Sequence, residues 1–98
     1  MVTEFIKFTG FEWDDGNQVK NLKYDVEYWE CEQVFFNEPL IILDDPTHSI
    51  AENRYAAFGK TDNGRLLTIV FTERREKIRV ISARNMSRKE RSFYEKTE

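Results

Sequence analysis

Residues 66–84, LLTIVFTERREKIRVISAR, give the clearest indication of the fold. They contain two runs rich in β-branched and aromatic residues, at 66–72 and 78–83, on either side of the charged stretch Arg74-Arg75-Glu76. Such runs, divided by a short polar segment, are typical of two strands that pair as an antiparallel hairpin. The pattern therefore predicts two paired strands joined by a charged turn.

Two further β-rich runs precede this hairpin, at residues 40–43 and 54–59. The turn sequence Thr61-Asp62-Asn63-Gly64 follows the second of them. An Asn-Gly pair tolerates positive φ and is a strong hairpin signal, so the strands before and after it should also pair. The second half of the chain is thus predicted to hold four antiparallel strands in a meander.

The first half has a different pattern. Its aromatic-rich opening is predicted to form a strand that ends at Asp14, whose carboxylate can cap the helix that follows. Apolar residues at helical spacing then predict a first helix over 15–25 and a second over 27–37. The second helix should stop there, because Pro39 disfavours helical backbone in the residue before it.

The last element is a charged helix that runs through Lys96. Ser87 and Glu90 have the spacing of a capping box that opens it, and Phe93 and Tyr94 are its expected anchors. The predicted fold is therefore α+β: an N-terminal strand, two helices, a four-stranded antiparallel meander and a C-terminal helix. The early helices are expected to cover one face of the sheet.

The composition fits one domain that spans residues 1–98. No apolar run approaches the roughly 20 residues of a membrane span, and the N-terminus lacks the pattern of a signal peptide, so we expect a cytoplasmic protein. Cys31 is the single cysteine and is expected to be buried and inert. A catalytic pairing of this thiol with His48, the single histidine, is much less favoured.

The net charge of −3 conceals a division between the two halves of the chain. Residues 1–49 hold three Lys/Arg and eleven Asp/Glu, or −8, whereas residues 50–98 hold twelve and seven, or +5. This division indicates two different surfaces, although scattered solubilising charge is the simpler interpretation.

Arg79 and Arg84 lie within an apolar strand, where a long cation is partly desolvated and needs an anion. An internal salt bridge to Glu52, Glu73 or Glu90 would meet that need as well as a phosphate. For several arginines on neighbouring strands we favour phosphate, because nearby acids are fewer than nearby bases. A clustered positive surface is typical of nucleic-acid binding.

Cleavage of RNA by its own 2′-hydroxyl needs no metal if basic groups stabilise the extra charge on the phosphate. Arginine suits this role through its planar fork of donors. The sequence contains no metal-ligand motif, Walker loop, GxSxG or HExxH, which argues weakly against other hydrolytic and phosphoryl-transfer chemistries.

The chain resembles the BrnT toxins, the RelE-like ribonucleases of bacterial type II toxin-antitoxin systems, over nearly its whole length. The residues that carry the resemblance are Phe11-Glu12-Trp13-Asp14, Lys20-Asn21, Val34-Phe35, Asp45-Pro46, His48-Ser49, Gly64-Arg65-Leu66-Leu67, Phe71-Thr72-Glu73-Arg74 and Ile78-Arg79-Val80-Ile81-Ser82-Ala83-Arg84. No single motif is specific, but their order is.

The resemblance implies a compact RelE-like sheet flanked by helices and metal-independent RNA cleavage, without a cofactor, that arrests translation. It also implies a cognate BrnA-like antitoxin that binds DNA and forms a hetero-oligomer with the toxin. By position, the candidates for catalysis are Lys20, Glu52, Arg54, Arg79 and Tyr94, with Glu52 and Tyr94 as proton or hydrogen-bond partners. The additional candidates for RNA binding are Arg65, Arg74, Arg84 and Arg88.

One departure from the family stands at Tyr24. The family typically has Lys-His-Gly-Val where this chain reads Lys23-Tyr24-Asp25-Val26, one residue shorter. A phenol titrates near pH 10 and an imidazole near 6.5, so Tyr24 substitutes poorly if the histidine is an acid or base. Two alternatives to an active toxin therefore stay open: a catalytically degenerate homologue that binds antitoxin or RNA, and a ParE-like inhibitor of a topoisomerase.

Overall fold

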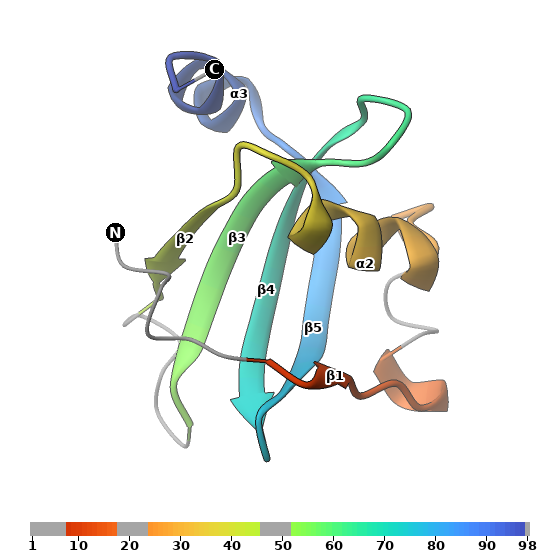
Figure 1. The fold of residues 1–98 in the computed structure, drawn as a ribbon. Coiled ribbons are helices and arrows are strands. Elements are labelled where there is room, and N and C mark those ends of the chain that lie inside the picture. The colour runs from red at the N-terminus through yellow and green to blue at the C-terminus, as the bar shows by residue number, and fades with distance from the viewer. Residues whose placement is uncertain (1–7, 18–23, 46–51, 98) are drawn as a thin grey trace.

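The computed structural model describes residues 8–17, 24–45 and 52–97. Residues 15–17 are helical. The elements in chain order are β1 (Gly10–Phe11), α2 (Tyr28–Phe36), β2 (Ile41–Asp44), β3 (Arg54–Lys60), β4 (Leu66–Arg74), β5 (Lys77–Asn85) and α3 (Arg88–Glu95). The predicted α+β class and the predicted order of elements are confirmed (Figure 1).

The sheet has five strands in the order β1-β5-β4-β3-β2. Strands β2 to β5 form the predicted antiparallel meander, with Asn63-Gly64 in the β3–β4 turn and Arg75-Glu76 in the β4–β5 turn. A fifth strand, β1, joins the meander by pairing in parallel with β5, and Gly10 lies opposite Lys77. The sheet is therefore mixed, because its first strand joins the edge strand that lies farthest from it in the sequence.

The helix boundaries follow from local capping. Asp14 accepts a hydrogen bond from the backbone N–H of Asn17 through Oδ1, as expected for a cap of the first helix. Most of that predicted helix, residues 18–23, lies outside the described residues, and Tyr24 and Asp25 already form a turn. Helix α2 starts after a capping box between Glu27 and Glu30 and ends before the cis Glu38–Pro39 bond.

The predicted capping box of α3 is also present. Ser87 Oγ accepts from the backbone N–H of Glu90, and the Glu90 carboxylate accepts from the backbone N–H of Ser87. Tyr94 then anchors the helix: it is fully buried with Ile41 and Met86. Phe93 is a weaker anchor, since it is 43% exposed.

The main core lies between α2 and the sheet. Cys31 and Val34 of α2 pack on the central strands, where Phe71 is fully buried. The helix approaches the sheet closely at Gly59, where a Cβ atom would stand only 2.7 Å from a methyl carbon of Val34. Helix α2 thus occupies one face of the sheet. The other face carries a second apolar cluster, in which Ile41 and Phe58 pack with Met86 and Tyr94, and polar side chains beside it.

None of the helices among the described residues is long and apolar enough to cross a membrane.

Candidate functional site

The arginine face is the side of the sheet opposite α2, and we define it by Arg54, Arg74, Arg79 and Arg84. Arg54 of β3, Thr72 of β4 and Arg79 of β5 are register partners, so their side chains form one row across three strands. Ile78 and Val80 on either side of Arg79 are buried under α2, as strand alternation requires. The row therefore places two cations on the face of the central strands opposite α2.

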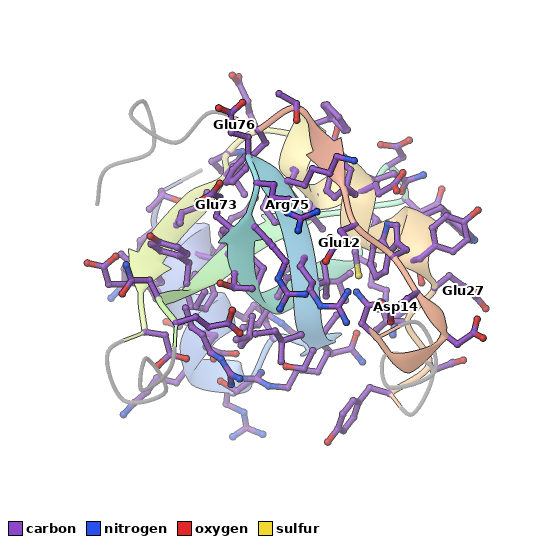
Figure 2. The ribbon with its side chains drawn as sticks, turned by 90° about the horizontal axis from the view of Figure 1, so that it is seen from below. Glu12, Asp14, Glu27, Glu73, Arg75 and Glu76 are labelled. Atoms are coloured by element: carbon purple, nitrogen blue, oxygen red, sulfur yellow. The ribbon has the colours of Figure 1, made fainter. Side chains whose placement is uncertain are left out.

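Arg79 is bound by two carboxylates from the segment after β1. Its Nη1 lies 3.1 Å from Oε1 of Glu12, and its Nη2 lies 2.9 Å from Oδ2 of Asp14. Figure 2 shows Glu12 and Asp14 side by side along this segment. The parallel pairing of β1 with β5 creates this contact, because it brings the start of the chain alongside Arg79.

Asn17 holds this segment in place. Its buried Nδ2 donates to the backbone carbonyls of Glu12 and Val80, at 3.1 and 3.0 Å. Its Oδ1 accepts from the backbone N–H of Asp14. The pKa of Asp14 is lowered, first by the backbone hydrogen bond from Asn17 and then by Arg79, so Asp14 carries its charge at neutral pH.

Arg74 extends the network toward the β4–β5 hairpin. Its Nη1 lies 3.3 Å from the same Glu12 oxygen that binds Arg79, and its Nη2 lies 3.8 Å from Oε2 of Glu52. With Arg54 beside them, three guanidinium groups and three carboxylates share this end of the face. The cluster, counting Asp14, is electrically balanced.

The other end of the arginine face holds Arg84. Its two terminal nitrogens bind both oxygens of Glu90, at 2.7 and 2.9 Å, and Thr68 donates to the same carboxylate. The Arg84 hydrogen bonds lower the pKa of Glu90 to about 2 against the opposing effect of burial. The pKa of Arg84 is raised, first by its hydrogen bonds with Glu90 and with a smaller contribution from Tyr24.

The remaining predicted residues are distributed as follows. Arg65 is tied to α2, with Nη1 at 3.0 Å from Glu30 Oε1 and Nε donating to Asn85. Arg88 is exposed at the start of α3. Lys20 lies outside the described residues. The structure therefore brings Arg54, Arg74, Arg79 and Glu52 together, and it places Arg65 in a structural contact.

Tyr94, which is predicted to be a proton or hydrogen-bond partner, lies in the core under α3. Its side chain is fully buried, and its hydroxyl donates to the backbone carbonyl of Pro39 at 2.5 Å. A hydroxyl so placed cannot reach a substrate on the surface. The predicted role as an anchor of α3 is the one that the structure shows.

The expectation that acids near the arginines would be scarce is wrong. Arg65, Arg74, Arg79 and Arg84 each form an ion pair with a carboxylate. Glu90 and Glu52 were considered as partners, but Glu12 and Asp14 were missed because they come from the acidic first half. The three-residue spacing of Asp14 and Asn17 was an available local signal, since it is the spacing of a capping box.

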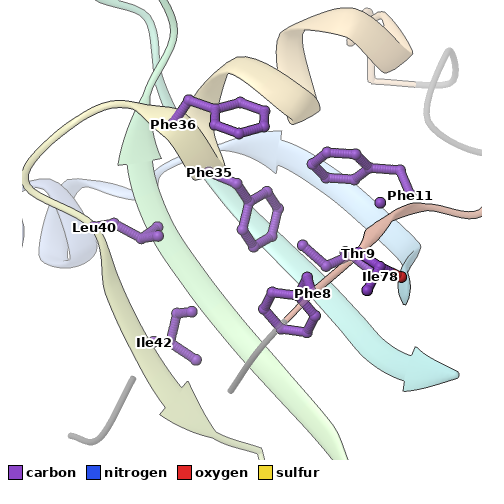
Figure 3. A pocket seen from close by; sticks show the side chains of 9 residues that line it. Phe8, Thr9, Phe11, Phe35, Phe36, Leu40, Ile42 and Ile78 are labelled. Atoms are coloured by element: carbon purple, nitrogen blue, oxygen red, sulfur yellow. The ribbon is translucent and has the colours of Figure 1, made fainter. Parts of the chain in front are cut away.

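A separate apolar pocket of about 490 Å³ opens between β1, α2 and β2 (Figure 3). Phe8, Phe11, Phe35, Phe36 and Leu40 are among the side chains that line it. Its lining contains no ionisable side chain, so it offers no group for phosphate binding or proton transfer.

Neither a reactive cysteine nor a cluster of metal ligands is found among the described residues. Cys31 is buried, and burial, with smaller contributions from Glu30 and Glu32, raises the pKa of its thiol to about 12, as expected for an unreactive cysteine. Within residues 8–17, 24–45 and 52–97, no three His, Cys, Asp or Glu side chains are grouped to hold a metal ion.

A comparison with protein families matches residues 13–90 to the family described as the ribonuclease toxin, BrnT, of the type II toxin-antitoxin system. A search of curated proteins found no match to the chain. The family match covers most of the chain, from Trp13 before the first helix to Glu90 in α3, and so includes every residue of the arginine face. The chain therefore belongs to the BrnT family of ribonuclease toxins of type II toxin-antitoxin systems.

Proposed function

We propose that this toxin is an endoribonuclease that cleaves RNA on the arginine face without a metal ion. The observation that carries the proposal is the row of Arg54, Thr72 and Arg79 across three strands, with Arg74 beside it. In the proposed reaction the 2′-oxygen of RNA attacks the adjacent phosphorus and the bond to the 5′-oxygen breaks. The products are a 2′,3′-cyclic phosphate and a free 5′-hydroxyl.

The arginines fit the electrostatic demand of this reaction. Charge builds up on the phosphate oxygens in the transition state, and fixed donors that point at them stabilise it. Arg79 is 19% exposed and held by two carboxylates, so its guanidinium is fixed in direction before RNA binds. We assign phosphate binding to Arg79, Arg54 and Arg74 on this ground.

A proton acceptor for the 2′-hydroxyl must also lie within reach. Glu52 and Glu12 are the carboxylates beside Arg74, and both side chains are about one-third exposed. We assign the proton-accepting role to Glu52, because Glu12 is already shared between Arg74 and Arg79. The leaving 5′-oxygen must take its proton from a group or a water within a few ångströms of the same phosphate.

The test is cleavage of a defined RNA by purified toxin in excess EDTA, with a parallel sample that contains ribosomes and Mg²⁺. Fragments that end in a 2′,3′-cyclic phosphate are expected in both samples. RNA that stays intact in EDTA and is cut when Mg²⁺ is restored would contradict the metal-independent mechanism. Fragments that end in a 3′-hydroxyl would contradict attack by the 2′-oxygen.

A toxin of this class has a cognate antitoxin. We propose that this partner is a DNA-binding, BrnA-like protein that covers part of the arginine face in a hetero-oligomer. Binding to the folded toxin alone would stabilise it by mass action. Adding the antitoxin should therefore raise the melting temperature of the toxin and protect RNA from it, and unchanged melting would contradict direct binding.

A second candidate function is a degenerate toxin that binds antitoxin or RNA without cutting. Two observations favour it: Tyr24 stands where the family has a histidine, and the charges of Arg74, Arg79 and Arg84 are all matched by carboxylates. Harmless overexpression together with tight antitoxin binding would select this function. Growth arrest with RNA fragmentation would select the ribonuclease.

A further inference from the structure

The two terminal nitrogens of Arg79 are occupied by two different acids. Nη1 binds Glu12 at 3.1 Å and Nη2 binds Asp14 at 2.9 Å. A phosphodiester also presents two acceptor oxygens, and a guanidinium binds them as a fork. Of the five N–H donors of the guanidinium, one on each terminal nitrogen therefore already binds a carboxylate of the toxin itself.

The two acids are not held equally. The Glu12 side chain is 31% exposed, and one of its oxygens is shared by Arg79 and Arg74. The Asp14 side chain is 54% exposed, and Arg79 is its single ion-pair partner among the described residues. An exposed pair contributes little free energy, so Asp14 is the contact that an incoming anion displaces first.

Asp14 also cannot move far from Arg79 when it is displaced. Its Oδ1 caps the helix start by accepting the backbone N–H of Asn17, and its own backbone N–H donates to Asn17 Oδ1. Asn17 is in turn fixed by the carbonyls of Glu12 and Val80. A bound phosphate would consequently lie next to a carboxylate that stays charged at neutral pH.

We propose that Nη2 of Arg79 is a phosphodiester subsite, and that Asp14 is an internal competitor that fills this subsite when RNA is absent. The inference rests on the proposed function, because it assumes that RNA is bound on the arginine face. It adds that Asp14 weakens RNA binding. The toxin then engages only RNA whose other contacts outweigh this competition.

The sign of the effect separates this role from a structural one. If Asp14 only positions Arg79, removing its charge loosens the guanidinium and weakens RNA binding. If Asp14 competes with phosphate, removing its charge frees Nη2 and strengthens binding. Asp14→Asn keeps a side-chain oxygen that can cap the helix while it removes the charge, so the substitution distinguishes the two roles.

The experiment measures binding of a short RNA carrying 2′-O-methyl groups at every position, which cannot be cleaved through its 2′-oxygen. Asp14→Asn is expected to bind this RNA roughly twofold to fivefold more tightly than the wild type. Asp15→Asn is the matched control, because the exposed neighbour lies outside the ion pairs of Arg79. Asp14→Ser keeps the capping oxygen and should show the same gain if Asp14→Asn folds poorly.

A double substitution then tests whether the gain passes through Arg79. In an Arg79→Ala background, Asp14→Asn should improve binding no more than Asp15→Asn does. Equal or weaker binding by both Asp14 variants in the wild-type background overturns the inference. Cleavage in EDTA is scored separately: its absence contradicts the proposed reaction, whereas tighter binding by Asp14→Asn still supports the subsite.

Discussion

Arg79 and Arg84 lie on the same face of β5. They are five positions apart in the sequence, so strict alternation would put them on opposite faces. Their partners on β4, Thr72 and Thr68, are four residues apart and share a face. The register shifts between Val70 and Phe71, which inserts one extra residue into β5 between the two arginines. This β-bulge is what lets one strand present both cations, about 13 Å apart along the strand, on the arginine face.

Removal of the Arg79 side chain should separate activity from stability. Arg79→Ala is expected to lower RNA cleavage by about 10²- to 10³-fold, because one preorganised donor to a charged transition state is lost. The melting temperature should fall by less than about 5 °C, since Glu12 and Asp14 keep enough exposure to be hydrated.

Cleavage rates and melting curves measured on the same preparations check this prediction. Arg75→Gln, an exposed change in the β4–β5 turn, is the control for the loss of one arginine. A variant that melts far earlier would show that Arg79 is chiefly structural. A variant with normal melting and full cleavage would remove Arg79 from the site.

The β4–β5 hairpin should gain stability from a better turn sequence. Arg75 and Glu76 both have positive φ, 55° and 65°, in a two-residue turn whose favoured residues are Asn and Gly. Figure 2 shows both of them, with Glu73, at the tip of the hairpin. The double change Arg75→Asn and Glu76→Gly is expected to raise the free energy of unfolding by about 1 kcal/mol.

Urea denaturation of the double variant measures this gain, and RNA cleavage should stay at the wild-type rate. The backbone hydrogen bond from Thr9 to the carbonyl of residue 76 is retained by glycine. A loss of stability would mean that the side-chain contact of Glu73 with the Glu76 backbone N–H depends on the native turn.

Local signals explain which parts of the fold were predictable. Asn63-Gly64 forms the turn of its own hairpin, and Ser87 with Glu90 forms the cap at the start of α3. Both signals involve residues that are close together in the sequence. The contact of Glu12 with Arg79 spans 67 residues and depends on the parallel pairing of β1, for which no turn or cap exists. The arginines were therefore predictable as a group, whereas the acids that neutralise them were not.

The Glu90 ion pair should give the protein a specific acid sensitivity. The pKa of Glu90 is lowered to about 2, mainly by Arg84, from an unfolded value near 4.5. A carboxyl whose folded pKa is lowered contributes stability that is complete above pH 4.5 and disappears as the pH falls toward 2. After a reduction for the solvent exposure of the pair, Glu90→Gln should therefore lose about 1 kcal/mol at pH 7 and almost nothing near pH 2.

Chemical denaturation at pH 7, 5, 3.5 and 2.5 checks this expectation. Glu95→Gln on the same helix is the control, because Glu95 is exposed and lies outside the Arg84 pair. A stability difference between Glu90→Gln and wild type that stays constant down to pH 2.5 would contradict a charged role for Glu90.

The cations of α3 should govern the salt dependence of RNA binding. Arg88, Lys89 and Arg91 are exposed, and within the described residues none of them forms an ion pair. Replacing all three by Gln is expected to reduce the slope of log K against log salt by about 2 if each contacts one phosphate of single-stranded RNA. Binding titrations between 50 and 300 mM salt measure this slope.

Arg75→Gln, at the far tip of the β4–β5 hairpin, is the control for these titrations. It should leave the slope unchanged while removing one surface charge. If the triple change on α3 also leaves the slope of log K against log salt unchanged, RNA does not bind along this helix.

We expect the residue at position 24 to affect how active the toxin is. It is 46% exposed, in the turn before α2, and lies close enough to Arg84 to affect its pKa. The resemblance to the family puts Tyr24 at the position of a histidine. A histidine there should be held partly neutral at pH 7, because the guanidinium of Arg84 disfavours a second positive charge.

Tyr24→His is accordingly expected to raise kcat/KM for RNA cleavage at least tenfold at pH 7, with a pH profile that bends near the histidine pKa. Tyr28→His is the matched control, because Tyr28 is similarly exposed on the first turn of α2 and packs against Trp13. Tyr24→Phe shows the reason if Tyr24→His brings no gain in cleavage. If Tyr24→Phe lowers cleavage, the tyrosine hydroxyl already performs the proton transfer. If neither change alters the rate and both variants fold, Tyr24 takes no part in proton transfer, and the acid for the leaving 5′-oxygen must come from elsewhere on the face.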